Sequence, residues 1–121
     1  MYEVLLDEPL GQGRFGLVYK AVKDGLEYAA KASLWDKEEQ LHTLKNVITM
    51  DKHENILDYK DLVIDGNTSW LFMEICSRGD LANFFTAHRK QFDLNKLEIL
   101  YQIANGVAAL HNNNIIHRDL K

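Results

Sequence analysis

The spacing of three glycines constrains the fold of this chain more than any other feature of its sequence. They stand in the segment GQGRFG at residues 11–16, and residues 17–22 then alternate between apolar and mixed positions as a strand does. Because glycine has no Cβ atom, such a loop can turn tightly and lie close to a phosphate chain. In dinucleotide-binding folds a helix follows this spacing. A strand therefore favours a hairpin that covers nucleotide phosphates, while a glycine-rich hairpin without a ligand stays open as the alternative.

Short apolar or alternating segments dominate the first 76 residues, and we expect them to be strands. The expected strands cover residues 4–10, 16–23, 26–33, 56–65 and 70–76. Asp24-Gly25 and Gly66-Asn67 are typical of hairpin turns. Residues 35–52 carry apolar side chains at helical spacing, which predicts one helix between the third and fourth strands.

The remaining chain has a helical pattern. Residues 80–90 predict a short helix and residues 95–111 a long one, with Asn95 and Glu98 as its capping box. The fold class predicted from these elements is α+β, with an antiparallel sheet lobe that holds one helix, a connector, and the start of a helical lobe. A cleft between two such lobes is a common place for a ligand.

Composition excludes several function classes. The 121 residues carry a net charge of −4, which argues against nucleic-acid binding and against an anionic membrane surface. No segment has the apolar length needed for direct membrane insertion. Cys76 is the single cysteine, which excludes an internal disulfide and suits a reducing, cytoplasmic setting. The parent protein of such a segment could still be anchored in a membrane elsewhere.

Two further motifs suggest phosphoryl transfer. In the third expected strand, Ala29 leaves room for a flat base and Lys31 offers a cation for phosphate oxygens. The segment HRDLK at residues 117–121 follows the long helix. There Asp119 would orient an acceptor hydroxyl and accept its proton, and Lys121 would stabilise charge on the transferred group. Each motif alone has an ordinary alternative: a solvated strand lysine, or a charged loop at a helix end.

The glycine hairpin, the strand lysine and the HRDLK segment, in this order, resemble the eukaryotic protein kinases over essentially the whole chain. The resemblance implies a protein kinase-like fold. The kinase N-lobe would cover residues 1–76, and residues 77–121 would hold the hinge exit and the start of a truncated helical C-lobe. It also implies ATP, a protein substrate and Mg²⁺, with no metal ligand in this segment and the metal-holding groups beyond residue 121.

The resemblance gives roles to individual residues. Met73 corresponds to the gatekeeper, and the Glu74 carbonyl and Cys76 amide correspond to the backbone groups that face adenine. The residues implied in ATP binding are Leu10, Gly11, Gly13, Phe15, Gly16, Val18, Ala29, Lys31, Met73, Glu74 and Cys76. The residues implied in catalysis are Asp119, Lys121 and Lys31.

Lys121 favours a serine/threonine kinase, because tyrosine kinases usually carry alanine or arginine at this position; a tyrosine kinase stays the alternative. The segments GRFG at residues 13–16 and KHENIL at residues 52–57 are also similar to the activin/TGF-β receptor serine/threonine kinases. In a complete domain the expected reaction is transfer of the ATP γ-phosphoryl group to protein serine or threonine. We expect the 121-residue chain alone to be inactive and to expose apolar helix faces.

One departure from the kinase pattern keeps a second interpretation open. Kinases pair the strand lysine with a helix glutamate, usually about nine to eleven residues before the histidine that corresponds to His53. His42, Thr43 and Leu44 occupy those positions here. Glu39 is the candidate partner of Lys31 if the helix is shifted. Without this ion pair, the chain would be a pseudokinase or a regulatory nucleotide-binding or interaction module.

Overall fold

The structure is a computed structural model that describes residues 1–13, 16–34, 38–118 and 120, without the side chains of residues 12, 13, 39 and 40. The chain forms two compact units. The sheet unit consists of Met1–Lys52 and Leu57–Ile75. The helical unit consists of His53–Ile56 and Cys76–Lys121.

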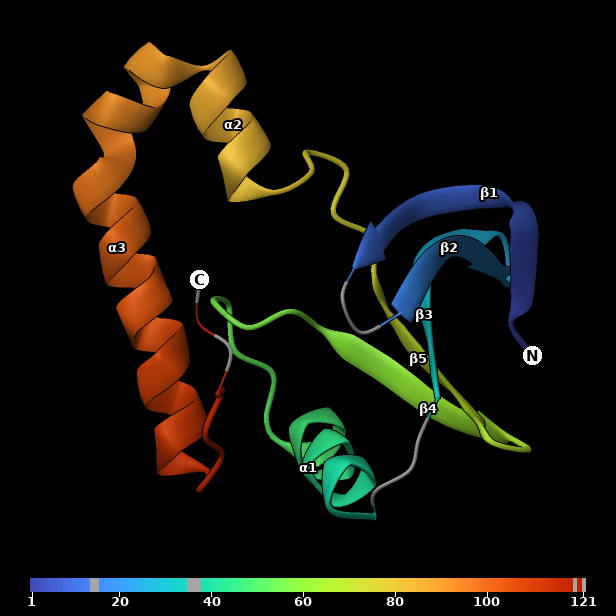
Figure 1. Cartoon of the computed structure of the whole chain (residues 1–121). Coiled ribbons are helices and arrows are strands. Elements are labelled where there is room, and N and C mark those ends of the chain that lie inside the picture. Colours follow the sequence, from blue (N-terminus) through green and yellow to red (C-terminus); the bar gives the residue numbers. More distant parts are fainter. Residues whose placement is uncertain (14–15, 35–37, 119, 121) are drawn as a thin grey trace. The chain divides into compact units, whose positions relative to one another are not determined.

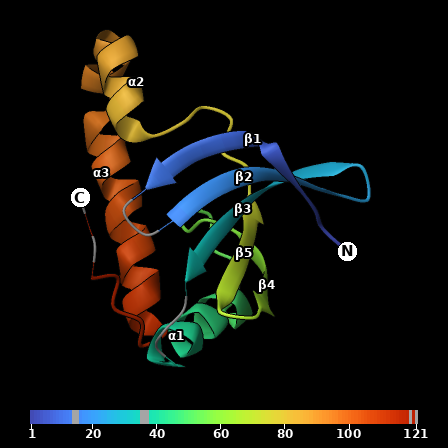
Figure 2. The same cartoon turned by 45° about the vertical axis from the view of Figure 1, so that its right-hand side comes forward.

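The sheet unit is a five-stranded antiparallel sheet with one helix against it (Figure 1). Its strands are β1 (Glu3–Gly13), β2 (Gly16–Lys23), β3 (Leu26–Leu34), β4 (Tyr59–Asp65) and β5 (Thr68–Glu74), and its helix is α1 (Glu38–Thr49). They lie in the order β1-β2-β3-β5-β4, and Figure 2 shows the twist of this sheet obliquely. The five predicted strands and the predicted helix are confirmed.

The two predicted hairpin turns are also confirmed. Asp24 and Gly25 have φ angles of 52° and 75°, the left-handed pair that a tight two-residue hairpin requires. Gly66 likewise has a positive φ of 62° between β4 and β5. The fourth strand begins three residues later than the apolar pattern indicated, because its register with β5 starts at Tyr59.

Each face of the sheet has its own apolar cluster. On one face, Ala21, Ala30 and Phe72 are buried, and Tyr2 stacks on Phe72 with ring centroids 3.9 Å apart. On the other face, Ala29, Leu71 and Met73 are buried. The partly buried residues packed against this second cluster include Leu44 and Ile48 of α1. The second face is therefore the one that α1 covers.

The helical unit contains α2 (Leu81–Ala87) and α3 (Arg89–Asn112). Asp80 caps α2, because its side chain accepts a hydrogen bond from the Asn83 backbone N–H at 2.7 Å. The predicted capping box of the long helix was wrong, since α3 begins at Arg89 and Asn95 lies inside it. The Asn95 side-chain amide donates to the Gln91 carbonyl one turn earlier, so it caps nothing.

The segment His53–Ile56 belongs to the helical unit because its backbone lies directly on α3. A Cβ atom at Gly106 would come 2.5 Å from the Asn55 carbonyl oxygen. Within the segment, the His53 Nδ1 atom accepts a hydrogen bond from the Asn55 backbone N–H at 3.0 Å. The absence of a side chain at Gly106 thus allows the close contact between this loop and α3.

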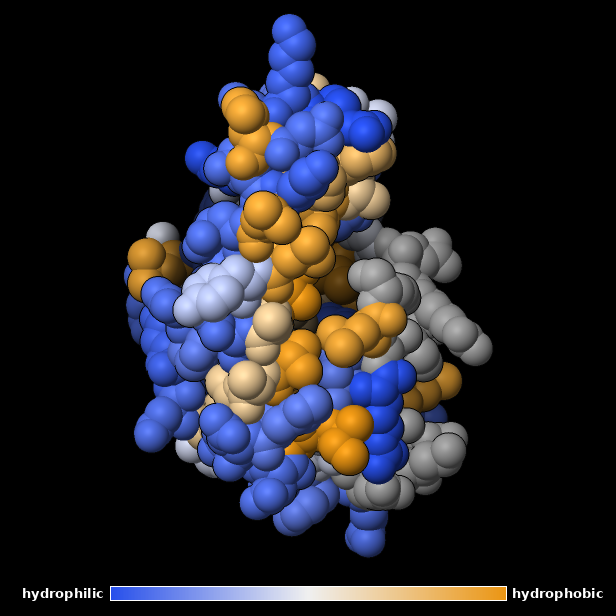
Figure 3. Space-filling model, turned by 90° about the vertical axis from the view of Figure 1, so that its left-hand side faces the viewer, coloured by the Kyte–Doolittle hydropathy of each residue, from blue (hydrophilic) through white to orange (hydrophobic). Residues whose placement is uncertain are grey.

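Much of α3 carries apolar side chains that nothing in the described chain covers. Leu94, Leu97, Leu100 and Tyr101 are 85%, 76%, 60% and 62% exposed. In Figure 3, which looks onto the left-hand side of Figure 1, hydrophobic residues (orange) gather along the face toward the viewer. The expected exposure of apolar helix faces is therefore confirmed. Among the described residues, no helix has the length and hydropathy needed to cross a membrane.

Candidate nucleotide site

The glycine hairpin is formed by β1 and β2. Gly11 lies opposite Val18, and Gly13 lies opposite Gly16. The tip of the hairpin at residues 14–15, and with it the predicted ATP contact Phe15, lies outside the described residues. Gly16 has φ 150°, and a Cβ atom there would meet the Ala32 carbonyl oxygen at 2.0 Å. Only glycine suits this position, where the hairpin joins the sheet.

Four of the predicted ATP residues lie on the same face of the sheet. Val18 is opposite Lys31, and Ala29 is opposite Met73, in the registers of β2, β3 and β5. Residues directly opposite in an antiparallel pair share a face, and Val18, Ala29 and Met73 all belong to the cluster on the α1 side. Lys31 joins them, because it is also opposite Leu71 of that cluster.

This face has two chemical parts. The alanine and methionine side chains make a small apolar surface, with Ala29 7% and Met73 9% exposed. Lys31 adds a cation two residues further along β3, toward the glycine hairpin in the register of β2. An apolar surface beside a cation and glycine backbone suits a flat base joined to phosphates.

The predicted ATP residues Leu10, Glu74 and Cys76 each lie in a different part of the chain. Leu10 lies at an irregularity in the β1–β2 register, between Pro9 and Gly11, and is 48% exposed. Glu74 is the last residue of β5. Cys76 is exposed and belongs to the helical unit, where its carbonyl accepts a hydrogen bond from the Gly79 N–H at 3.2 Å.

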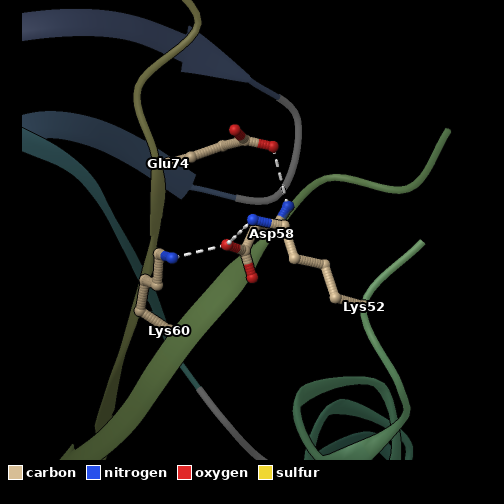
Figure 4. Close-up of polar contacts among 4 residues, drawn as sticks. All are labelled: Lys52, Asp58, Lys60 and Glu74. Carbon is tan, nitrogen blue, oxygen red and sulfur yellow. Dashed lines mark hydrogen bonds and ion pairs between the residues drawn. The ribbon is translucent and has the colours of Figure 1, made fainter. Parts of the chain in front are cut away.

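A polar cluster at the end of β5 was not anticipated from the sequence. It consists of Asp58, Glu74, Lys52 and Lys60 (Figure 4). The Asp58 N–H donates to Glu74 Oε1 at 2.8 Å, and the Asp58 carboxylate pairs with both lysines. The hydrogen bond from Lys60, followed by that from Lys52, holds the pKa of Asp58 below its ordinary value against the opposing effect of burial. No sequence pattern indicates this cluster, because it joins residues 16 positions apart.

Helix α1 gives no carboxylate at the positions where the kinase pattern expects one. Leu44, one of these positions, packs with Ile48 against the cluster that contains Ala29 and Met73. Glu39, the candidate partner of Lys31, lies in the first turn of α1, but its side chain is outside the described part of the structure.

The predicted catalytic residues Asp119 and Lys121 also lie outside the described residues. Within the described ranges, no group of three His, Cys, Asp or Glu side chains could hold a metal ion.

Comparison with known proteins places the chain in one family. The family described as protein kinase domain matches residues 4–121. A probable serine/threonine-protein kinase zyg-1 of Caenorhabditis briggsae is 30% identical over 115 residues, covering 93% of this chain and 16% of the relative. The human serine/threonine-protein kinase ULK1 is 34% identical, covering 99% of this chain and 12% of its own length. The mouse serine/threonine-protein kinase ULK3 is 33% identical, and the match covers 97% of this chain and 26% of the length of ULK3.

The chain thus spans about a quarter or less of the length of these three relatives. All three are named as serine/threonine kinases, so the tyrosine-kinase alternative gains no support from them. The match over residues 4–121 agrees with the antiparallel sheet, its single helix and the helices that follow. This chain belongs to the protein kinase domain family.

Proposed function

We propose that the chain is the ATP-binding part of a protein kinase that transfers the γ-phosphoryl group of ATP to serine or threonine of a protein substrate. The observation that carries the proposal is the common face of Val18, Ala29, Lys31 and Met73 next to the glycine hairpin. In the proposed complex, the adenine lies against Ala29 and Met73. The phosphates lie under the glycine backbone, within reach of the Lys31 ammonium group.

The chemistry of the transfer requires groups beyond this face. Asp119 would orient the substrate hydroxyl and accept its proton as the oxygen attacks the γ-phosphorus, and Lys121 would balance charge on the transferred group. Kinase domains generally use Mg²⁺, which neutralises the phosphates when bound. Among the described residues, no group of three His, Cys, Asp or Glu side chains could hold a metal ion. The lone cysteine and the acidic net charge support a cytoplasmic setting without nucleic-acid partners.

ATP binding is the first test of the proposal. Titration of the 121-residue chain with ATP should show saturable binding, and Lys31→Met should weaken it by about tenfold or more, as loss of a charge-assisted phosphate contact does. Lys45→Met is the matched control, because Lys45 is exposed on α1. No binding by the wild-type chain, or equal effects of the two substitutions, would overturn the ATP site.

Phosphoryl transfer is tested in the full-length protein. Lys31→Met and Asp119→Asn should each abolish transfer of radiolabelled phosphate from ATP to a serine/threonine peptide library. Transfer at the wild-type rate by both variants would show that the roles given to these residues are wrong.

A regulatory nucleotide-binding module is the second candidate, and Leu44 is the observation that favours it. A leucine packed into the core occupies a position where an active kinase would be expected to carry its lysine-pairing glutamate. Assays of ATP binding and of phosphate transfer distinguish the two candidate functions. A full-length protein that binds ATP but transfers no phosphate, with or without added Mg²⁺, is a pseudokinase.

A further inference from the structure

We infer that Asp58 is a positioning residue for the adenine end of the nucleotide site, because it fixes the backbone of β5 at Glu74. This inference rests on the proposed ATP binding. It concerns the polar cluster of Asp58, Glu74, Lys52 and Lys60 shown in Figure 4. None of the proposed nucleotide contacts other than Glu74 belongs to this cluster.

Asp58 and Glu74 are joined by two hydrogen bonds in opposite directions. The Glu74 N–H donates to the Asp58 carbonyl at 2.9 Å, and the Asp58 N–H donates to the Glu74 side-chain Oε1 at 2.8 Å. On its other side, Glu74 lies opposite Tyr28 in the register of β3. The last residue of β5 is therefore held from both sides, although the ladder between β4 and β5 begins only at Tyr59.

An irregularity in β4 anchors Asp58 in turn. Tyr59 is opposite Met73 and Asp61 is opposite Phe72, so Lys60 is an extra residue in the β4 strand. Such a bulge redirects a side chain, and here the Lys60 ammonium group pairs with the Asp58 carboxylate. Lys52 pairs with the same carboxylate oxygen at 3.3 Å. The Asp58 side chain is only 19% exposed, whereas that of Lys52 is 77% exposed.

The two hydrogen bonds between Asp58 and Glu74, which together form a clamp, lie next to the proposed adenine surface. Glu74 directly follows Met73, which lies opposite Ala29 on the proposed adenine surface. A shift of Glu74 therefore changes the surface that receives the base. The phosphate part depends on the glycine hairpin and on Lys31, which lie in β1, β2 and β3 rather than in β4. Both hydrogen bonds to Glu74 use backbone atoms of Asp58, so removal of the Asp58 carboxylate acts by releasing the anchor to Lys60 and Lys52. Loss of this anchor should weaken binding of the base and spare binding of the phosphates.

Three probe ligands separate these contributions: ATP, adenosine and inorganic triphosphate, each titrated into the 121-residue chain by calorimetry. Asp58→Ala should weaken ATP and adenosine by about tenfold, the effect of about 1.4 kcal/mol. It should change the affinity for triphosphate by less than about twofold. Glu74→Ala, which removes the Oε1 acceptor, should reproduce this pattern. Asp65→Ala is the matched control, because Asp65 is an exposed aspartate at the other end of β4.

Thermal unfolding of each variant is recorded alongside, and Asp58→Asn provides a milder substitution that keeps the side-chain size. It should also weaken adenosine more than triphosphate. Wild-type adenosine affinity in both Asp58 variants, or equal losses for adenosine and triphosphate in folded protein, would overturn the positioning role. Failure of the wild-type chain to bind ATP would instead overturn the ATP site itself, and the inference with it.

Discussion

The backbone of Gly16 lies so close to Ala32 that a Cβ atom on Gly16 would be 2.0 Å from the Ala32 carbonyl oxygen. The Gly16 φ of 150° is also one that side-chain-bearing residues rarely adopt. The third glycine of the hairpin is thus required by the sheet itself, in addition to any need for close approach to phosphates. The close contact with Ala32 and the strain of the positive φ can be separated by experiment.

Gly16→Ala should destabilise the sheet unit by more than the ~1–3 kcal/mol expected from backbone strain alone. Gly25→Ala is the control that isolates the strain, because Gly25 has φ 75° and no atom within 4 Å of an added Cβ. Urea unfolding measures both free energies. Equal losses for the two variants would mean that the contact with Ala32 relaxes without cost.

Gly106→Ala tests the contact between the loop at Asn55 and α3. Replacing glycine by alanine inside a helix ordinarily stabilises it by about 1 kcal/mol. Here the added Cβ would lie 2.5 Å from the Asn55 carbonyl oxygen, a backbone atom that cannot rotate away. We therefore expect net destabilisation, with faster hydrogen exchange at the Ile56 amide, which donates to the His53 carbonyl. Increased stability with unchanged exchange would contradict the contact.

Local patterns predicted the sheet well and the long helix less well. The residues of β2 coincide with the predicted segment, because alternation and flanking glycine and turn residues mark both of its ends. The start of α3 was missed because asparagine followed by glutamate three positions later looks like a cap. In the structure, the amide of Asn95 bonds to the Gln91 carbonyl instead, and the helix extends back to Arg89.

The exposed face of α3 should make the 121-residue chain self-associate. Leu94 and Leu97 are 85% and 76% exposed, and contiguous apolar surface of this kind favours association in water. Leu94→Lys with Leu97→Lys should shift the chain toward the monomer in light scattering without lowering its melting temperature, since neither side chain is packed. Leu110→Lys, at a position that is only 9% exposed, should unfold the helical unit. Unchanged association of the double variant would show that another surface is responsible.

For the candidate site, sequence patterns indicated the residues on the strands. They did not indicate the hydrogen bonds and packing that hold these residues in place. Val18, Ala29, Lys31 and Met73 share a face because each lies at a matching position in its strand, and alternation makes that readable. The clamp at Glu74 depends on a bulge at Lys60, which alternation alone does not reveal. Leu44 departs from the kinase pattern in the sequence, but only the folded sheet unit shows that it packs against the core.

Because of the Asp58 ion pairs, the stability of the sheet unit should fall as the pH becomes acidic. The hydrogen bond from Lys60 is the largest cause that lowers the pKa of Asp58, with Lys52 next. A carboxyl group with a lowered pKa stabilises the folded state above its unfolded pKa of about 4, and this contribution is lost as the pH falls through the folded pKa. Urea unfolding at pH 7 should show Asp58→Asn less stable than wild type by about 0.5–1 kcal/mol, and the difference should shrink toward pH 2.

Lys60→Met is the partner variant in this experiment, because it removes the largest cause of the lowered Asp58 pKa and leaves the carboxyl group in place. It should lose stability at pH 7 and should also converge with wild type in acid. The pKa of Lys60 is itself raised by the hydrogen bond to Asp58. The contribution of this pair is therefore fully present at neutral pH, and it is lost in acid as Asp58 is protonated and in alkali as the pH rises through the raised pKa of Lys60. A stability difference between wild type and Asp58→Asn that is as large at pH 2 as at pH 7 would show that packing, rather than charge, explains the role of Asp58.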